Sequence, residues 1–478
     1  MTDFAPPLPS PAARPWSATD DTAFLGHPRG LGWLAFSELW ERFSYYGMQT
    51  LLVLYMVHAL LLPGHVEHVW GFDGFRRGLE SVYGPLSVQA LASAIFGLYA
   101  GTVYLTPIAG GWIADRWLGR TTTITVGALL MALGHFLMAF EASFLIALAC
   151  LLLGVGAFKG NISSQVGALY GQDDPRRATA FQIFLLAVQI AVIVSPWLCG
   201  HLTEDGKYWD RGFGAAGVGM VIGLLTYLGG RRWMPPEERI AASAAAAVEP
   251  RPPLSAADRR KVGLLVLLIP VLALTVVGNQ QIFNSYLIWA EKNLDLHLFG
   301  QEIAVTSLIS LDSIISTATL LASLLFWHVW RKVLREPDEL MKITMGVAVA
   351  ACAPLLLAGA SAAVQATGHR AGIGWVVASQ IVNDFGFANI LPVGLALYSR
   401  AAPRGMTGTM VGVYYTHLFF ANMGVGWLGG QYEKMSASAF WTMHAAIVGV
   451  SAVLLLLVRL TVGRGLTPAY DAPAEARA

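Results

Sequence analysis

Charged side chains are scarce in this sequence. Asp, Glu, Lys and Arg make up only 13% of its 478 residues, whereas hydrophobic residues make up 55% and the mean hydropathy is +0.56. A soluble domain of this length would carry about 25% charged residues. The composition therefore excludes a soluble fold and predicts a membrane protein with many spans.

Cysteine and a charge excess of either sign are also missing. The three cysteines, Cys150, Cys199 and Cys352, lie in apolar runs without the spacing of metal ligands. We interpret them as small buried hydrophobic residues and predict no metal site. The formal net charge of +1 gives no electrostatic reason to expect nucleic acid as a partner.

Catalytic motifs are absent as well. The sequence has no His-Glu-x-x-His, no Gly-x-Ser-x-Gly and no Walker loop. Five histidines lie in or near apolar runs without forming a cluster. A histidine can carry protons near neutral pH, but a single one on an apolar helix is better interpreted as a satisfied core or interface residue. We predict that the protein is not an enzyme.

Long apolar runs dominate the sequence. A helix needs about 20 apolar residues to cross a bilayer, and twelve runs reach that length. They cover residues 32–61, 89–114, 121–140, 143–170, 179–201, 213–233, 262–290, 302–330, 341–365, 371–399, 408–430 and 439–462. The expectation is an all-α membrane protein with 12 transmembrane helices.

The runs fall into two sets of six. Residues 234–261 lie between the sets, are rich in Pro, Ala and charge, and predict a cytoplasmic linker. Two six-helix halves, 31–233 and 262–463, are the plan of the major facilitator fold, which keeps its substrate site at the midplane between the halves. Residues 1–30 predict a disordered cytoplasmic tail rather than a signal peptide, and residues 464–478 a second cytoplasmic tail. A channel or a structural bundle of twelve helices is the alternative.

Lysine and arginine are distributed unevenly over the loops. The loops that follow even-numbered runs, including the linker, carry 17 of them, and the loops on the other side carry 7. Because positively charged loops stay in the cytoplasm, we predict that both termini are cytoplasmic. The protein is then an integral protein of the plasma membrane, which in a bacterium is the inner membrane.

The first apolar run contains charges that a lipid-facing helix cannot carry. Five polar residues share one helix face at spacings i, i+3, i+4, i+7 and i+11, namely Glu38, Glu41, Arg42, Tyr45 and Gln49. Ionised side chains within a bilayer are costly unless they pair or face water. Two carboxylates beside one arginine cannot both stay ionised cheaply, so Glu41, together with Glu38, is a candidate proton acceptor. A permanent ion-pair network that only holds helices together is the alternative.

The same segment resembles the hallmark of the proton-dependent oligopeptide transporter family, Glu-x-x-Glu-Arg-Phe-x-Tyr-Tyr-Gly, and residues 38–47 contain all seven of its fixed positions. The resemblance extends along most of the chain. Further family signatures are matched at Gly110 to Arg120, at Phe158-Lys159-Gly160-Asn161 and at Pro392-Val393-Gly394-Leu395. The resemblance implies a carrier that moves small peptides together with protons, which act as the coupling ion, and that uses no cofactor.

The resemblance also implies roles for individual residues. Glu38, Glu41, Arg42 and Lys159 would couple transport to protons. Because a lone buried ammonium is expensive, Lys159 is expected to pair with a carboxylate of the first helix and to lie near the carboxylate of the peptide. Candidate substrate contacts are Tyr45, Tyr46, Tyr99, Lys159, Asn161, Gln189, Gln280 and Asn284.

Some family positions are altered in this sequence. Gln49 stands where the family usually has arginine, and Phe387 stands where it has the glutamate that faces the amino end of the peptide. An ammonium group in a dry pocket still needs an anion, and Asp312 and Asp384 are the carboxylates within the second set of runs. We expect that Asp312 has taken over proton coupling or amino-end binding and that Asp384 is the second candidate, as a substrate contact. The alternative for each is a helix cap or an interfacial position.

The sequence thus predicts a symporter that imports di- and tripeptides with protons by alternating access and works as a monomer in the lipid bilayer. A competing hypothesis is a proton-coupled carrier of the same fold for a modified peptide or an organic anion, which the lost charges at Gln49 and Phe387 favour. Two further hypotheses are an intramembrane enzyme, which the missing catalytic motifs disfavour, and a nutrient sensor without transport.

Overall fold

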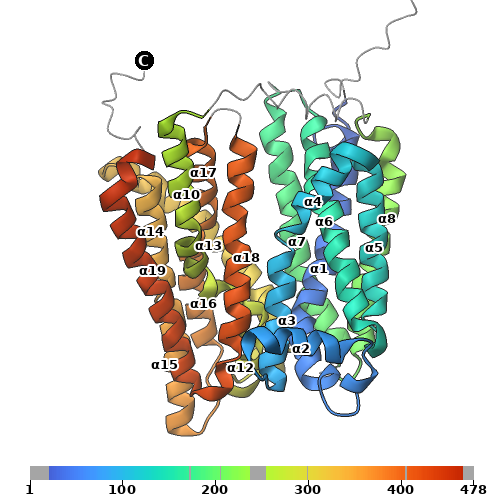
Figure 1. Ribbon diagram of the computed structural model, residues 1–478, viewed down its shortest axis with the longest axis vertical. Helices are drawn as coiled ribbons and strands as arrows, with labels where there is room; N and C mark the ends of the chain where they lie inside the picture. The colour runs from blue at the N-terminus through green and yellow to red at the C-terminus, as the bar shows by residue number, and fades with distance from the viewer. Residues whose placement is uncertain are drawn as a thin grey trace, which may run out of the picture.

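The computed structural model describes residues 21–171, 174–204, 206–236, 254–298, 300–403 and 406–466. Figure 1 shows an upright bundle of helices in which the first and last described residues lie on the same side. We call this side the termini side and the other the opposite side. Of the predicted tails and linker, residues 1–20, 237–253 and 467–478 lie outside the described residues.

The first half of the chain forms the right-hand part of the bundle (Figure 1). Its helices are α1 (Arg29–Tyr55), α2 (Phe72–Tyr83), α3 (Val88–Thr102), α4 (Thr106–Ile113), α5 (Arg120–Leu137), α6 (Phe144–Ala168), α7 (Arg176–Leu202) and α8 (Trp209–Gly230). The short helical segments are η2 (Met56–Leu60), η3 (Val66–His68), η4 (Ala114–Leu118), η5 (Glu141–Ser143) and η6 (Arg231–Trp233). The helix α1 begins inside the predicted tail 1–30, because Leu31 and Leu34 are fully buried and anchor its first turns.

The second half forms the left-hand part of the bundle (Figure 1). Its helices are α10 (Ala256–Thr275), α11 (Val277–Gln280), α12 (Ser285–Asn293), α13 (Ser307–Val333), α14 (Glu339–Ala350), α15 (Ala353–Thr367), α16 (Gly374–Phe387), α17 (Leu391–Ala401), α18 (Thr407–Gly429) and α19 (Ala437–Leu466). The short segments are η7 (Gln281–Phe283), η8 (Tyr432–Lys434), β1 (His297–Leu298) and β2 (Gln301–Glu302). The helix α10 begins inside the predicted linker, where Ser255 and Asp258 form a capping box.

Prolines divide three of the apolar runs into two helices each. Pro107, Pro354 and Pro392 lie in the first turns of α4, α15 and α17. Proline lacks the backbone N–H that a helix interior requires, but it is well suited to the first turn of a new helix. The corresponding spans are therefore segmented where the sequence analysis predicted single runs.

The seventh apolar run is broken near its middle. The segments α10 and α11–η7 meet at an angle of 50°, and Asn284 has φ −124° and ψ −115°, outside the helical region. Irregular backbone at membrane depth is tolerated only where protein buries it or where it lines a cavity. The break therefore marks a place where this run faces the interior of the bundle.

Each of the twelve predicted apolar runs contains helix. Eight helical segments of the described chain are long and apolar enough to cross a membrane, and there are nine if the bent pair α10 and α11–η7 counts as one span. The helix α1 has the length but carries Glu38, Glu41 and Arg42 in its middle.

The two halves meet along two pairs of helices. The helix α3 packs against α18, and α7 packs against α13, while α1 packs against α7 and α8 of its own half. A Cβ atom added at Gly97 would lie 2.5 Å from the backbone oxygen of Asn422. Glycine at this position therefore allows the backbones of α3 and α18 to approach closely.

Two short elements were not predicted. The helix α2 buries Phe72 and Leu79 and leaves most of its other residues partly or fully exposed, and β1 and β2 form a small hairpin. Both lie in loops of the opposite side, outside the apolar runs that guided the sequence analysis.

Candidate functional site

Arg42 is the centre of a buried charged cluster on α1. Its guanidinium binds Glu41 in a bidentate manner, through Nε to one carboxylate oxygen and through Nη2 to the other at 2.6 Å. Its Nε also lies 3.3 Å from Oε1 of Glu38. All three residues are at most 5% exposed. The helix therefore folds both carboxylates around one arginine, as their i−4 and i−1 spacing predicted.

The other faces of α1 pack against neighbouring helices, and this packing orients the charged cluster. Ser195 of α7 donates a hydrogen bond to the backbone oxygen of Phe43 at 2.5 Å, and Ser44 donates one to Ala216 of α8 at 2.7 Å. Gly47 leaves room for Cys199, because a Cβ atom there would lie 2.6 Å from its sulfur. Small residues thus seat α1 against α7 and α8, and the charged face turns toward the remaining interior.

Lys159 on α6 does not form the ion pair that the sequence analysis predicted. In the described chain it has no carboxylate within ion-pair distance, and its Nζ lies 5.4 Å from the centre of the Tyr104 ring. The reason is that Arg42 already binds both nearby carboxylates. A cation above a ring is stabilised by the electrostatic field of the ring, so Tyr104 is a functional candidate in addition to the residues predicted above.

The four charged groups balance formally. Glu38 and Glu41 together carry the opposite charge to Arg42 and Lys159 when all are ionised. Glu38 nevertheless keeps one buried oxygen, Oε2, that has no hydrogen-bond donor among the described residues. The cluster thus contains one carboxylate that is only partly neutralised by Arg42 and one cation that is free of carboxylates.

The three predicted tyrosines surround this cluster. The ring of Tyr45 lies 5.1 Å from the guanidinium carbon of Arg42, and the ring of Tyr46 lies 6.2 Å from that of Phe283 in the broken run of the other half. The Tyr99 hydroxyl is buried without a hydrogen-bond partner in the described chain. The tyrosines therefore connect the charged cluster to the boundary between the halves, with one hydroxyl available.

The predicted amides fall into two groups. Asn161 donates to the backbone oxygens of Gly110 and Ala157 at 3.3 and 2.8 Å. The contact with Gly110 ties α6 to α4, whereas Ala157 lies on α6 itself. The role of Asn161 as a substrate contact stays a prediction. Gln189 lies at the boundary, where its amide donates to Thr317 of the other half at 2.9 Å.

The broken run places Asn284 beside α3 of the first half and Gln280 beside α18 of its own half. Asn284 accepts a hydrogen bond from Ser93 at 3.0 Å and lies 3.4 Å from the backbone oxygen of Val425. Gln280 lies near Asn279 and Asn422, at 3.3 and 3.5 Å. These amides therefore join the break to α3 and α18, and Asn284 is fully buried there.

Asp312 and Asp384 lie next to each other in the second half. Their carboxyl groups are within hydrogen-bonding reach, and Asn383 donates to Asp384 at 3.0 Å. Gln380, which the sequence analysis missed, donates to the hydroxyl of Tyr286 and to the backbone oxygen of Leu308, both at 3.2 Å. Its one detectable sign in the sequence is an amide inside an apolar run.

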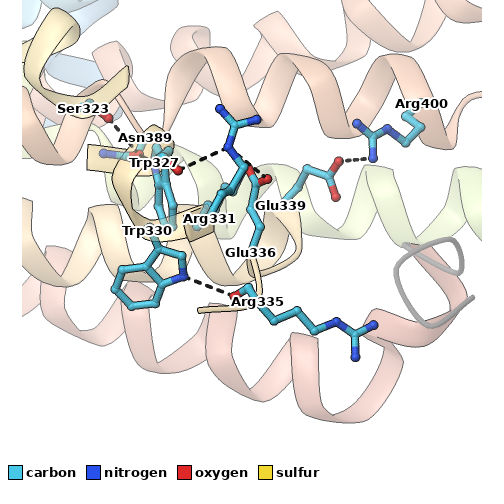
Figure 2. Close-up of polar contacts among 10 residues, drawn as sticks. Ser323, Trp327, Trp330, Arg331, Arg335, Glu336, Glu339, Asn389 and Arg400 are labelled. Carbon is cyan, nitrogen blue, oxygen red and sulfur yellow. Dashed lines mark hydrogen bonds and ion pairs between the residues drawn. The ribbon is translucent and has the colours of Figure 1, made fainter. Parts of the chain in front are cut away.

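A second charged network lies at the termini side of the second half. Figure 2 shows Glu339, at the start of α14, facing Arg400 at the end of α17, with 2.5 Å between Oε1 and Nη1. In the same view Asn389 accepts hydrogen bonds from Trp327 and Ser323 of α13, at 2.5 and 3.1 Å. This network fastens α13, α14 and α17 to one another.

The histidines have two kinds of partner, backbone oxygens of their own helix or an acidic side chain of the other half. His417 and His444 are buried and hydrogen bonded to backbone oxygens of their own helices, as predicted for core histidines. His58 is different, because its Nε2 lies 2.8 Å from Glu291 of the other half and its side chain is 43% exposed. His58 also has a partner, but that partner is an acidic side chain remote in sequence and not a backbone oxygen of its own helix.

Comparisons with known proteins now identify the chain. Residues 121–249 and 254–443 match the profile of the POT family. The chain belongs to the POT family. As a member of that family it is a membrane transporter and not an enzyme.

Relatives of this POT protein match along nearly its whole length. The peptide transporter YePEPT of Yersinia enterocolitica is 28% identical over 91% of this chain and 94% of its own. The di-/tripeptide transporter of Lactococcus lactis is 27% identical over 92% of this chain and 96% of its own.

Solved structures confirm the major facilitator fold. A peptide transporter POT in complex with sulfate superposes with a TM-score of 0.77 at 24% identity, covering 93% of this chain and 96% of that one. A POT family transporter in complex with 5-aminolevulinic acid gives a TM-score of 0.76 at 22% identity, covering 95% and 99%.

The two positions that differ from the usual POT residues, Gln49 and Phe387, have different surroundings in the structure. Phe387 packs against the hydrophobic core of the second half, so the position of the missing glutamate is now apolar. Gln49 is 6% exposed, and its Oε1 has no donor among the described residues. In this POT protein Asp312 and Asp384 are carboxylates in the interior of α13 and α16 in the second half.

Proposed function

We propose that this POT protein imports di- and tripeptides together with protons. The observation that carries the proposal is the buried cluster of Glu38, Glu41 and Arg42, with Lys159 nearby but free of a carboxylate. Charges held inside a membrane protein mark ion and substrate pathways. Both relatives described above carry names that refer to peptide transport.

The polar groups suit the two ends of a peptide. Lys159 and Arg42 would bind the peptide carboxylate, and Tyr45, Tyr46 and Tyr99 would offer hydroxyls and apolar surfaces to its side chains. Asp312, with Asp384, would provide the negative charge for the amino end or for proton coupling. Gln189 and Asn284 each contact the other half, and Gln280 lies beside Asn422 of α18, so these amides would transmit substrate binding to the boundary of the halves.

We assign the termini side to the cytoplasm, with both tails and the linker there and the chain in the plasma membrane. The excess of positive charge in the loops of that side supports the assignment. At the opposite side the halves are joined by His58 with Glu291, by Ser87 with Glu433, and by Trp197 with Ser310. A transporter closed on that side faces inward, and residues 31–233 and 262–463 would be the two bodies that rock.

A transport cycle follows from these contacts. A proton that reaches Glu41 from outside weakens its bidentate bond with Arg42. The peptide carboxylate then binds the released guanidinium and Lys159, and the halves reorient. Loss of the proton to the cytoplasm restores the pair and expels the peptide. The driving force suffices, because a unit charge gains about 2.3 kcal/mol per 100 mV and one pH unit adds about 1.4 kcal/mol.

The test is dipeptide uptake by proteoliposomes under an imposed pH gradient. Wild-type protein should accumulate labelled dipeptide, whereas Glu41→Gln and Lys159→Ala should not. Glu204→Gln and Lys207→Ala make matched controls, because both residues lie at the surface of the opposite side. The proposal fails if wild-type protein accumulates no peptide, or if the buried and surface variants behave alike.

A carrier of a modified peptide or an organic anion remains the second candidate. The apolar side chain at Phe387 favours it, because no carboxylate replaces the family glutamate at that position. Competition separates the two, since unlabelled dipeptides should block uptake if peptides are the cargo. Stronger competition by amino-blocked peptides than by free ones would favour the second candidate.

A further inference from the structure

The second half contains a pair of carboxyl groups that, unlike the two carboxylates of the cluster on α1, has no arginine beside it among the described residues. Asp312 lies near the start of α13, and Asp384 lies in the last turns of α16, two helices that pack against each other. Their carboxyl groups are within hydrogen-bonding reach of one another. Two such groups can form that bond only if one of them carries a proton.

The hydrogen-bond donors around the pair are too few for its carboxyl oxygens. Asn383 donates to one oxygen of Asp384, but Oδ2 of Asp384 and Oδ1 of Asp312 are buried and have no donor among the described residues. A second amide nearby, that of Gln380, uses its Nε2 for Tyr286 and Leu308. Its own Oε1 is also buried without a partner, so acceptor oxygens are in excess.

Among the described side chains, no positive one forms an ion pair with either carboxyl group. The titratable group that faces it is the Tyr286 hydroxyl of α12. Among the helices packed around it, α15 and α16 contain no Lys, Arg or His. The basic residues of α7, α12, α13 and α14 lie near the helix ends, at Arg176, Arg177, His201, Lys292, His328, Arg331, Lys332 and Lys342. On α19, His444 bonds to Gln281, and Arg459 pairs with Asp338.

Two like charges in contact without a counter-ion cannot both persist in a buried site. A single proton removes the repulsion and forms a hydrogen bond from a carboxylic acid to a carboxylate, one of the stronger types. We propose that Asp312 and Asp384 bind one proton jointly, as a second proton site separate from the cluster on α1. One carboxylate gains the O–H bond, the other accepts from it, and the charge of the pair changes from −2 to −1.

A small cavity gives the pair room for a water contact. It has a volume of about 40 Å³ and is lined by Asp312, Tyr286, Asn279, Gln380 and Asn383, among others. That is room enough for a water molecule with several polar partners. Because Asn279 and Tyr286 flank the break in the seventh run, the cavity connects the pair to the segment that joins the halves.

The inference rests on the proposed function, since the shared proton would be a second coupling proton. It deepens that proposal by giving each half a proton site of its own. In the first half an arginine competes with the proton for the carboxylates. In the second half no lysine, arginine or histidine of the described residues forms an ion pair with Asp312 or Asp384, so the two act as one group around the proton.

The first test measures protons moved per peptide from the membrane potential at which net uptake reverses. Asp312→Asn, Asp384→Asn and the double variant are compared with Asp73→Asn, which changes an exposed residue of α2. We expect each pair variant to move one proton fewer per peptide, the double variant to match the single ones, and peptide counterflow to continue. Unchanged stoichiometry in all pair variants would overturn the inference.

The second test needs no transport and covers a variant that is inactive. Infrared difference spectra between acidic and alkaline buffer should show a protonated carboxyl band that Asp312→Asn and Asp384→Asn each remove and Asp73→Asn retains. A band untouched by these variants contradicts the shared proton. Loss of uptake when choline replaces sodium in the buffer also contradicts the shared proton, because the pair then binds a metal cation. If wild-type protein shows the band but no proton-driven uptake, the proposed function fails and the proton site stands.

Discussion

The imidazole of His58 and the carboxylate of Glu291 pair across the two halves, with 2.8 Å between Nε2 and Oε2. The helix α1 ends at Tyr55, so His58 lies beyond it on the opposite side. Both side chains line a cavity of about 460 Å³, and Arg370 and Glu302 line it as well. The pair therefore closes the side that we assign to the outside with a group that titrates.

External pH should control this closure. The hydrogen bond to Glu291 raises the pKa of His58 above its ordinary value of 6.5. The charged pair is therefore complete below about pH 6.5 and is lost as pH rises through the raised pKa. The thiolate is the reactive form of cysteine, so each labelling rate is divided by that of an exposed cysteine at the same pH. This relative rate, for a cysteine in place of Ala304, which lines the cavity, should be higher at alkaline pH than at acidic pH.

His58→Gln provides the control for that measurement. Glutamine keeps a polar side chain but cannot gain the proton, so the relative labelling rate should stop depending on pH in this range. Side-chain exposures of 43% and 30% mean that solvent screens the pair, so a shift in rate is expected rather than complete opening. An unchanged pH profile in His58→Gln would show that another group controls access.

Glu41→Gln should uncouple transport from the proton gradient. It removes the charge that binds Arg42 in two places and leaves only Glu38 at 3.3 Å. Breaking a buried ion pair costs about 3–5 kcal/mol, and the remaining carboxylate should reduce that cost. We expect loss of gradient-driven accumulation, retained counterflow and a lower melting temperature in detergent. Accumulation at the wild-type level would exclude Glu41 as the proton acceptor.

Tyr104→Leu should weaken peptide binding through Lys159. The Tyr104 ring lies under the ammonium at 5.4 Å, and a contact of this kind contributes about 0.5–2 kcal/mol. Tyr104→Phe keeps the ring and should leave KM near the wild-type value, whereas Tyr104→Leu should raise it. Equal KM values for the two variants would show that the ring face does not position Lys159.

Glu339→Gln should destabilise the second half. Glu339 is 4% exposed and faces Arg400, and removing one partner of a buried charge pair typically costs about 3–5 kcal/mol. Arg400 is 56% exposed, so water can solvate it and the loss should fall below that range. Thermal unfolding in detergent measures the change, with the exposed Glu302→Gln as the control. Equal melting temperatures would mean that the network in Figure 2 adds little stability.

Local patterns predicted much of the site. The face of α1 that carries Glu38, Glu41 and Arg42 follows from helical spacing, and the structure has the same contacts. The contact between Lys159 and Tyr104 could not be predicted. Arg42 and Lys159 compete for the carboxylates of the first helix, and only the distances in the folded protein decide which cation binds them. The neighbourhood of Asp312 and Asp384 was equally hidden, since these residues belong to different helices of the bundle.

The amino-acid sequence by itself determined that this protein lies in a membrane, where its helices run and which residues of the first helix carry buried charge. Those properties depend on apolar length and on spacing within one helix, which neighbouring residues define. Only the tertiary structure decided that Lys159 lies over Tyr104, that Asp312 meets Asp384 and that His58 reaches Glu291. Such contacts depend on how separate helices pack, and packing is a property of the whole bundle.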